Sequence, residues 1–312
     1  MARKLGLPAL VLVTVMLVAS TSVAGDGKAG STYLDVFAIG VGAGPSAVAA
    51  YTAAPGDMWS LTYNPAGLAG IDRMGLGVSQ IEWLADASYS YLGMGMPSGM
   101  GGLALGLAYF DMGGVSSVTD MYGTIDPDAS AEAYNFGFVG GYGFQFPNLC
   151  DLDVGVSGHV IQGSLDEDTA TAIGLNVGGL YHLMDRQVHI GLAARNIGTQ
   201  VEFEDEAYDQ TITFAGGVSY TTVKDQIPNV DVMVGVDALM PKDQDAQVAL
   251  GGEVWLYDVL ALRAGYRSGM EQGNLTYGAG FKYSDFQLDY TYADYEDLEA
   301  THRISLTMGF GN

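Results

Sequence analysis

The final stretch of the chain, Thr301–Phe310, alternates between apolar and polar side chains, and this alternation constrains the fold more than any other feature. One parity holds Ile304, Leu306, Met308 and Phe310, and the other holds Arg303, Ser305, Thr307 and Gly309. Successive side chains of a β-strand point to opposite faces, so the segment predicts a strand with one apolar and one polar face. A last strand of this kind, with an aromatic residue near its end, is typical of outer-membrane β-barrels.

The same alternation recurs between clusters of turn residues from Met74 to the end of the chain. It predicts an all-β fold, a transmembrane antiparallel β-barrel of about 14 strands. The expected strands are 74–83, 87–96, 102–110, 133–146, 152–164, 171–182, 187–197, 210–221, 230–240, 246–257, 260–267, 274–283, 286–293 and 301–310. An even strand count and a closed sheet follow, because lipid leaves no partner for the polar groups of an open strand edge.

Connections between these strands alternate in length, which separates a membrane barrel from a soluble β-sandwich. Every second connection is short, as at 98–101, 147–150, 183–186, 258–259 and 284–285. The intervening ones are mostly longer and acidic, as at 111–132, 165–170, 198–209, 241–245, 268–273 and 294–300. Short turns at one rim and long loops at the other are the asymmetry of a bacterial outer-membrane barrel.

The N-terminal part of the chain divides into two segments that do not alternate. Residues 1–24 carry a basic start, an apolar run and a small-residue cleavage pattern ending at Ala24, which together predict a signal peptide. Residues 25–73 form a Gly- and Ala-rich segment with a helical turn expected at Asn64-Pro65-Ala66, since Asn is a good N-cap and Pro is favoured at the first helical position. We expect this segment to lie inside the barrel of residues 74–312 as a short plug.

Charge and cysteine content exclude several classes of protein. Ten Lys and Arg residues follow residue 24, against 36 Asp and Glu, so the remaining chain has a formal charge of −26, which argues against a nucleic-acid partner. The single cysteine, Cys150, cannot form an internal disulfide. No histidines cluster at the spacing of metal ligands, and no catalytic residues are predicted, so we expect a protein without cofactor or metal that is not an enzyme.

Several segments resemble the PorV/PorQ family, within the broader group of FadL-like outer-membrane proteins (the OMPP1/FadL/TodX type). Tyr63–Ala69 is similar to its N-P-A-G-L segment, Gly191–Gly198 to a strand-end motif and Asp297–Leu306 to its C-terminal signature; Ala249–Ser268 is similar as well. The sequence departs from the family at Gly40–Asp57, where the family has a Gly/Met-rich run before paired acidic residues. The resemblance implies a 14-stranded barrel in the bacterial outer membrane with its N-terminus inside the lumen.

That resemblance leaves two functions open. FadL-like members pass hydrophobic compounds across the outer membrane, so one expectation is passive transport of a hydrophobic small molecule through a plugged lumen. PorV-like members work with a secretion machine, so the alternative is a surface protein that docks exported protein cargo in a type IX-like system. Both place the protein in contact with outer-membrane lipid, and neither fixes its oligomeric state.

Two groups of residues are candidates for the functional site. The plug candidates either contact a hydrophobic ligand or only fill the barrel, and they are Met58, Trp59, Leu61, Tyr63, Asn64 and Pro65. The charged candidates either guide a substrate and fix the plug or only pair with one another in the lumen, and they are Glu253, Arg263, Arg267, Lys282, Asp289 and Arg303. Arg195 and His159 are open to the same two interpretations. Acidic loop residues are expected to form a solvated rim, with a bridging role for divalent cations as a hypothesis.

Overall fold

The computed structural model describes most of the barrel and the segment before it. The described residues are 32–33, 36–84, 86–113, 115–119, 125–131, 133–146, 151–165, 168–203, 206–222, 227–242, 244–269, 275–295 and 300–311. The predicted signal peptide, Cys150 and the acidic loop residues at 166–167, 204–205 and 296–299 lie outside them.

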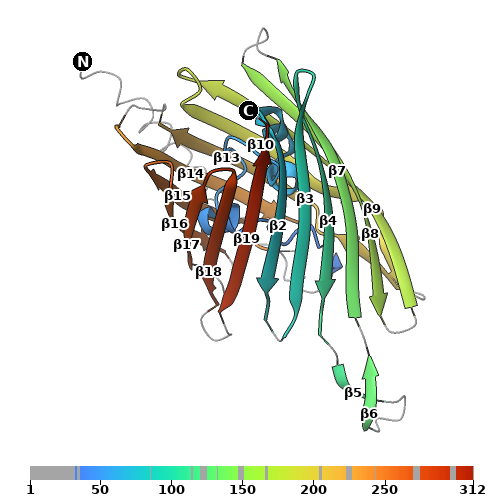
Figure 1. The fold of residues 1–312 in the computed structure, drawn as a ribbon. Helices are drawn as coiled ribbons and strands as arrows, with labels where there is room; N and C mark the ends of the chain where they lie inside the picture. The colour runs from blue at the N-terminus through green and yellow to red at the C-terminus, as the bar shows by residue number, and fades with distance from the viewer. Residues whose placement is uncertain are drawn as a thin grey trace.

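Fourteen antiparallel strands form one closed barrel (Figure 1), which confirms the predicted fold class. In barrel order from the first strand, they are β2 (Met74–Glu82), β3 (Ser88–Ser98), β4 (Gly101–Asp111), β7 (Ala133–Phe146), β8 (Leu152–Leu165), β9 (Asp168–Leu183), β10 (Val188–Gly198), β13 (Thr213–Thr221), β14 (Val230–Pro241), β15 (Gln247–Leu256), β16 (Leu260–Ser268), β17 (Leu275–Tyr283), β18 (Phe286–Asp294) and β19 (Thr301–Phe310). The last strand pairs with the first, from Phe310 opposite Met74 to His302 opposite Glu82, and this pairing closes the sheet.

Two of the connections that were expected to be loops contain strands. The connection after β4 forms the hairpin β5 (Val115–Thr119) and β6 (Ile125–Ala131). The connection after β10 contains β11 (Val201–Phe203) and β12 (Glu206–Gln210), and β1 (Thr32–Tyr33) pairs in parallel with β12. These strands are short, and their sequences lack a sustained alternation, so the period-two criterion did not detect them.

The two faces of the barrel differ in polarity as the alternation predicts. Large apolar side chains stand exposed on the outer face, as at Leu192 (67% exposed) and Phe214 (58%), while the next residue in each strand is buried. A wall with this exposed apolar face and closed backbone hydrogen bonding is the architecture of a transmembrane β-barrel. Among the described residues, no helix is both long and apolar enough to cross a membrane.

Residues 36–71, called the luminal segment below, lie inside the barrel (Figure 1). They form α2 (Ala43–Val48), α3 (Ser60–Tyr63) and the 3₁₀ helix η1 (Pro65–Gly70). The helical turn predicted at Asn64-Pro65 is η1: the Asn64 side chain accepts a hydrogen bond from the Ala66 backbone N–H at 3.1 Å, and Pro65 occupies the first helical position. The sequence analysis did not predict α2, which has no side-chain cap.

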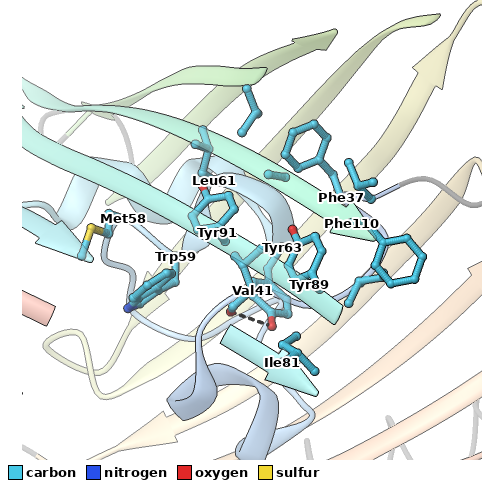
Figure 2. Packing of buried hydrophobic residues seen from close by; sticks show 14 of the residues in the cluster. Phe37, Val41, Met58, Trp59, Leu61, Tyr63, Ile81, Tyr89, Tyr91 and Phe110 are labelled. Carbon is cyan, nitrogen blue, oxygen red and sulfur yellow. Dashed lines mark hydrogen bonds between the residues drawn. The ribbon is translucent and has the colours of Figure 1, made fainter. Parts of the chain in front are cut away.

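One side of the luminal segment packs against the first barrel strands in an apolar cluster (Figure 2). Trp59 lies 5.9 Å from the ring of Tyr91 on β3, and Leu61 and Leu68 are fully buried. Glycines on the inner face make room for these side chains: a Cβ at Gly77 would lie only 2.7 Å from the Trp59 ring. The glycine enrichment of the chain therefore serves close approach between wall and luminal segment here.

Candidate functional site in the barrel lumen

Polar side chains of the barrel wall hydrogen-bond the backbone of the luminal segment. A buried peptide group needs such a partner, and the short helices leave many of their groups unpaired. The wall donors to luminal carbonyl oxygens are Thr291 to Ala43 (2.5 Å), Thr276 to Ala47 (2.9 Å), Arg267 to Ala49 (3.2 Å), Ser219 to Ala53 (2.7 Å), Ser157 to Leu61 (3.1 Å) and Gln145 to Ala69 (2.7 Å). The wall acceptors are Ser305 Oγ for the Ala43 N–H (3.1 Å) and Asp237 Oδ2 for the Thr52 N–H (2.7 Å).

A cavity of about 280 Å³ lies on the polar side of the luminal segment, toward the rim that carries the longer connections. We call it the first cavity. Its charged lining residues are three arginines, Arg195, Arg267 and Arg303, and one carboxylate, Asp237. Aromatic and apolar groups, among them Trp83 and Leu239, line other parts of the cavity. Three guanidinium groups and one carboxylate give the lining of the first cavity a formal charge of +2. The whole chain, in contrast, has a net charge of −24.

Hydrogen bonds join the first cavity to the luminal segment. Arg303 donates from Nη1 to Ser46 Oγ at 2.9 Å, and Ser46 lies 3.4 Å from the Tyr63 hydroxyl. That hydroxyl donates to the Val41 carbonyl oxygen at 3.1 Å, and burial raises the pKa of Tyr63 above its ordinary value. Tyr63 therefore stays protonated and fixes the chain before α2.

A second cavity, of about 230 Å³, lies toward the rim with the short turns. Arg263 on β16 binds two carboxylates there, Glu253 and Asp289, with a distance of 2.8 Å to Asp289. The same guanidinium lies 5.4 Å from the centre of the Trp255 ring. Buried charges need partners of opposite sign, and this triad supplies them from β15, β16 and β18.

Asp57 of the luminal segment also lines the second cavity. Its side chain is accessible from the cavity, but protein surrounds it on the other sides, and this burial raises the pKa of Asp57 from 3.8 to about 7. The nearby charges of Asp289 and Glu253 raise it further, while the backbone N–H of Trp59, which donates to Asp57 Oδ1 at 2.8 Å, opposes the shift. Asp57 thus titrates near neutral pH, and no earlier expectation had singled it out. Asp57 lies two residues before Trp59, the N-cap of α3, and its backbone N–H donates to Ser60 Oγ at 3.3 Å. Nothing in the local sequence marks this aspartate for a raised pKa, because the shift comes from its surroundings in the fold.

The six plug candidates occupy different environments. Met58 and Leu61 are buried in the apolar cluster, and neither lines the two cavities. Trp59 lines the second cavity and Tyr63 the first. Asn64 and Pro65 are buried, and Asn64 Nδ2 donates to the carbonyl oxygens of Thr52 and, on β9, Gly179.

The six charged candidates divide into two groups and one separate residue. Glu253, Arg263 and Asp289 meet at the second cavity, whereas Arg267 and Arg303 line the first. Lys282 is half-buried near the short-turn end of β17 and lines neither cavity. Of the two remaining candidates, Arg195 lines the first cavity, and His159 is buried against Phe37 with its Nε2 3.0 Å from Gln210 Oε1.

The described part of the chain contains no group of three or more His, Cys, Asp or Glu side chains that could hold a metal ion. Two histidines, His182 and His189, lie with their Nδ1 atoms 2.6 Å apart. His182 Nε2 also contacts Asp153 at 2.7 Å, and Arg186 pairs with the same carboxylate at 3.0 Å.

Solved structures of other proteins share this architecture. The "CymD monoaromatic hydrocarbon channel" superposes with a TM-score of 0.61 at 12% identity, over 88% of this chain and 98% of that one. The "TodX monoaromatic hydrocarbon channel deltaS2 mutant" gives 0.59 at 12% identity, over 87% and 99%. A Pseudomonas aeruginosa FadL homologue gives 0.50 at 12% identity, over 84% and 96%.

These likenesses define the class of the protein through its fold: it is a 14-stranded transmembrane β-barrel similar to FadL- and TodX-type barrels. No protein-family profile matches the chain. No curated protein sequence matches it either. The fold is therefore what this chain shares with the three structures above.

Proposed function

We propose that the protein lies in the bacterial outer membrane and passes small hydrophobic molecules through its lumen. The observation that carries this proposal is the presence of two cavities on opposite sides of α2, with Pro45 lining both. The luminal segment is what separates them. A molecule that crosses the barrel through these cavities must displace α2 or its neighbours.

Two further features support passage of an apolar compound. Two similar structures carry names that describe monoaromatic hydrocarbon channels. Trp83 and Leu239 at the first cavity, and Trp59 and Trp255 at the second, offer apolar surface on each side of the barrier. The long-connection rim faces the exterior in this proposal, which follows from the loop asymmetry of outer-membrane barrels.

On its polar side, the luminal segment is held by separate hydrogen bonds to the barrel wall, which can break one at a time. Most are single hydrogen bonds from wall hydroxyl groups such as Thr276 and Ser219, each worth about 1 kcal/mol net. In contrast, the apolar cluster on β2, β3 and β4 buries many side chains together and anchors the other side. We infer that the polar side, with α2, moves during passage while the apolar side stays docked.

Uptake by intact cells tests the proposal. Bacteria that produce the protein are expected to accumulate toluene faster than cells without it, with no gain in sensitivity to a large hydrophilic antibiotic such as vancomycin. Removal of residues 36–71 is expected to admit both compounds, because the barrier is then absent. The proposal is wrong if the full-length protein adds no toluene uptake although it is folded in the outer membrane.

A second candidate function is docking of secreted protein cargo, which the resemblance to the PorV/PorQ family suggests. The observation that favours it is the hairpin β5–β6, which extends well beyond the barrel at the long-connection rim and offers a surface for a partner (Figure 1). Removal of residues 115–131 would then abolish co-purification of exported proteins and leave toluene uptake unchanged. Co-purification that survives this deletion would exclude the hairpin as the docking surface.

A further inference from the structure

The luminal segment carries a single charge, and that charge faces a cavity whose other carboxylates have the same sign. Asp57 is the only charged residue among residues 36–71. It lines the second cavity together with Glu253, Asp289 and Arg263, so the lining has a formal charge of −2 when Asp57 is ionised. Like charges around one cavity repel one another, and a cation bound between them turns this repulsion into attraction.

The guanidinium group of the second cavity is engaged with the barrel wall. Arg263 pairs with Glu253 and, at 2.8 Å, with Asp289. Asp57, in contrast, forms no ion pair with any described residue. Its Oδ1 accepts the Trp59 backbone N–H at 2.8 Å, and its side chain is exposed to the cavity. Asp57 is therefore the carboxylate of this cavity that is available to a ligand, and its pKa of about 7 agrees with the lack of a cationic partner.

The remaining walls of the second cavity are aromatic and apolar. Tyr51, Trp59 and Trp255 line it, together with Pro45 and Val48. The faces of aromatic rings attract cations, and apolar side chains accommodate the hydrocarbon body of a ligand. A metal ion, in contrast, needs several ligand atoms, and the described residues contain no group of three His, Cys, Asp or Glu side chains that could hold one. The lining of this cavity thus fits an organic cation and not a metal ion.

We propose that the second cavity is a binding site for a small organic ammonium ion. The ammonium group of the ligand donates to the Asp57 carboxylate, and its apolar body lies against the aromatic side chains of the cavity. The volume of about 230 Å³ has room for an amine with one aromatic ring or a short alkyl chain. The ligand reaches the site from the rim with the short turns, because the three arginines of the first cavity repel a cation.

Calorimetry with phenethylamine and the purified full-length barrel in detergent tests the site at about pH 8. Asp57 is then mostly ionised, and an alkyl ammonium group stays charged, as lysine does. Asp57→Asn is expected to raise the Kd of phenethylamine about tenfold or more, because a charge-assisted hydrogen bond is lost. The matched control is Asp285→Asn, at an exposed aspartate of the same rim, which should leave the Kd unchanged. Heat-modified gel mobility verifies that every variant is a folded barrel.

The pH dependence of binding separates direct contact with Asp57 from a purely structural role of this residue. With a pKa of about 7, the ionised fraction of Asp57 falls from about nine-tenths at pH 8 to about one-tenth at pH 6. The Kd of phenethylamine for the wild type is therefore expected to rise about tenfold over this range. The Kd for Asp57→Asn should not change, because the variant lacks the titrating group.

A neutral ligand of the same shape completes the test. Phenethyl alcohol has the apolar body of phenethylamine without its charge, and we expect it to bind the wild type at least about tenfold more weakly. Phenethylamine that binds Asp57→Asn as tightly as the wild type would overturn the site, and so would phenethyl alcohol that binds as tightly as phenethylamine. Amine binding that depends on Asp57 supports the site whether or not cells take up toluene, so this inference and the proposed function can fail separately.

Discussion

Asn64 is the residue on which the start of η1 depends. It is buried, its Oδ1 accepts from Ala66, and its amide donates to Thr52 and Gly179. Asn64→Ala removes the cap and leaves backbone groups unpaired, so we expect a loss of about 1 to 3 kcal/mol from the free energy of unfolding. The urea midpoint of the detergent-solubilised barrel measures this. Ser98→Ala, at an exposed position of β3, should leave the midpoint within error; equal effects of the two changes would contradict the role of Asn64.

Asp57 gives the luminal segment a pH dependence. Because its folded-state pKa is about 7 against an ordinary 3.8, the folded state holds the proton between about pH 4 and pH 7, where the unfolded chain has lost it. Stability attributable to Asp57 is therefore highest below pH 4, falls as the pH rises to 7 and is constant above it.

The difference in urea midpoint between wild type and Asp57→Asn isolates this contribution, because all other titrating groups are shared. Asn keeps an acceptor for the Trp59 N–H. Relative to the variant, we expect the wild type to lose stability between pH 4.5 and pH 7.5. If the difference in urea midpoint between the wild type and Asp57→Asn stays constant over this range, the pKa of Asp57 in the folded protein is at its ordinary value.

At the scale of elements, glycines of the wall fix how closely the luminal segment approaches it. A Cβ at Gly155 on β8 would overlap the backbone of Pro65 and Ala66, whereas a Cβ at Gly158, three residues along the same strand, would have no neighbour closer than 3.8 Å. Gly155→Ala is expected to displace η1 and to make residues 36–71 accessible to added protease. Gly158→Ala should behave as the wild type. Protection of the segment in both variants would mean that η1 shifts without undocking.

The elements that could be predicted from sequence are those with long, regular alternation. All 14 barrel strands were predicted within a few residues of their observed bounds, as with 230–240 for β14 (Val230–Pro241), because burial of one face imposes the period of two on every strand. The helix α2 was not predicted, since Ala43–Val48 is held by wall residues more than 200 positions away in the sequence, such as Thr291 and Ser305. The sequence of residues 43–48 alone does not indicate contacts with residues so distant in the chain.

The site was less predictable than the wall for the same reason. Alternation placed Arg263, Arg267 and Arg303 on the inner face. It could not tell that Arg263 meets two carboxylates while the others line a cavity and hydrogen-bond the luminal segment. That difference depends on where the luminal segment lies. Asp57 illustrates the point most clearly, because its surroundings come from β15 and β18.

At the scale of the whole molecule, the account depends on movement of the luminal segment between two cavities, and a reversible lock on that segment tests it most directly. A Cβ built at Gly235 on β14 lies 3.5 Å from the Cβ of Ala50, within the range of a disulfide. The experiment uses Ala50→Cys with Gly235→Cys in a Cys150→Ser background and measures toluene uptake by cells before and after reduction. We predict that the oxidised protein takes up toluene no faster than cells without the barrel, and that a reductant restores uptake. Uptake at the wild-type rate by the fully oxidised protein would contradict the central claim, because molecules would then cross the lumen without moving α2.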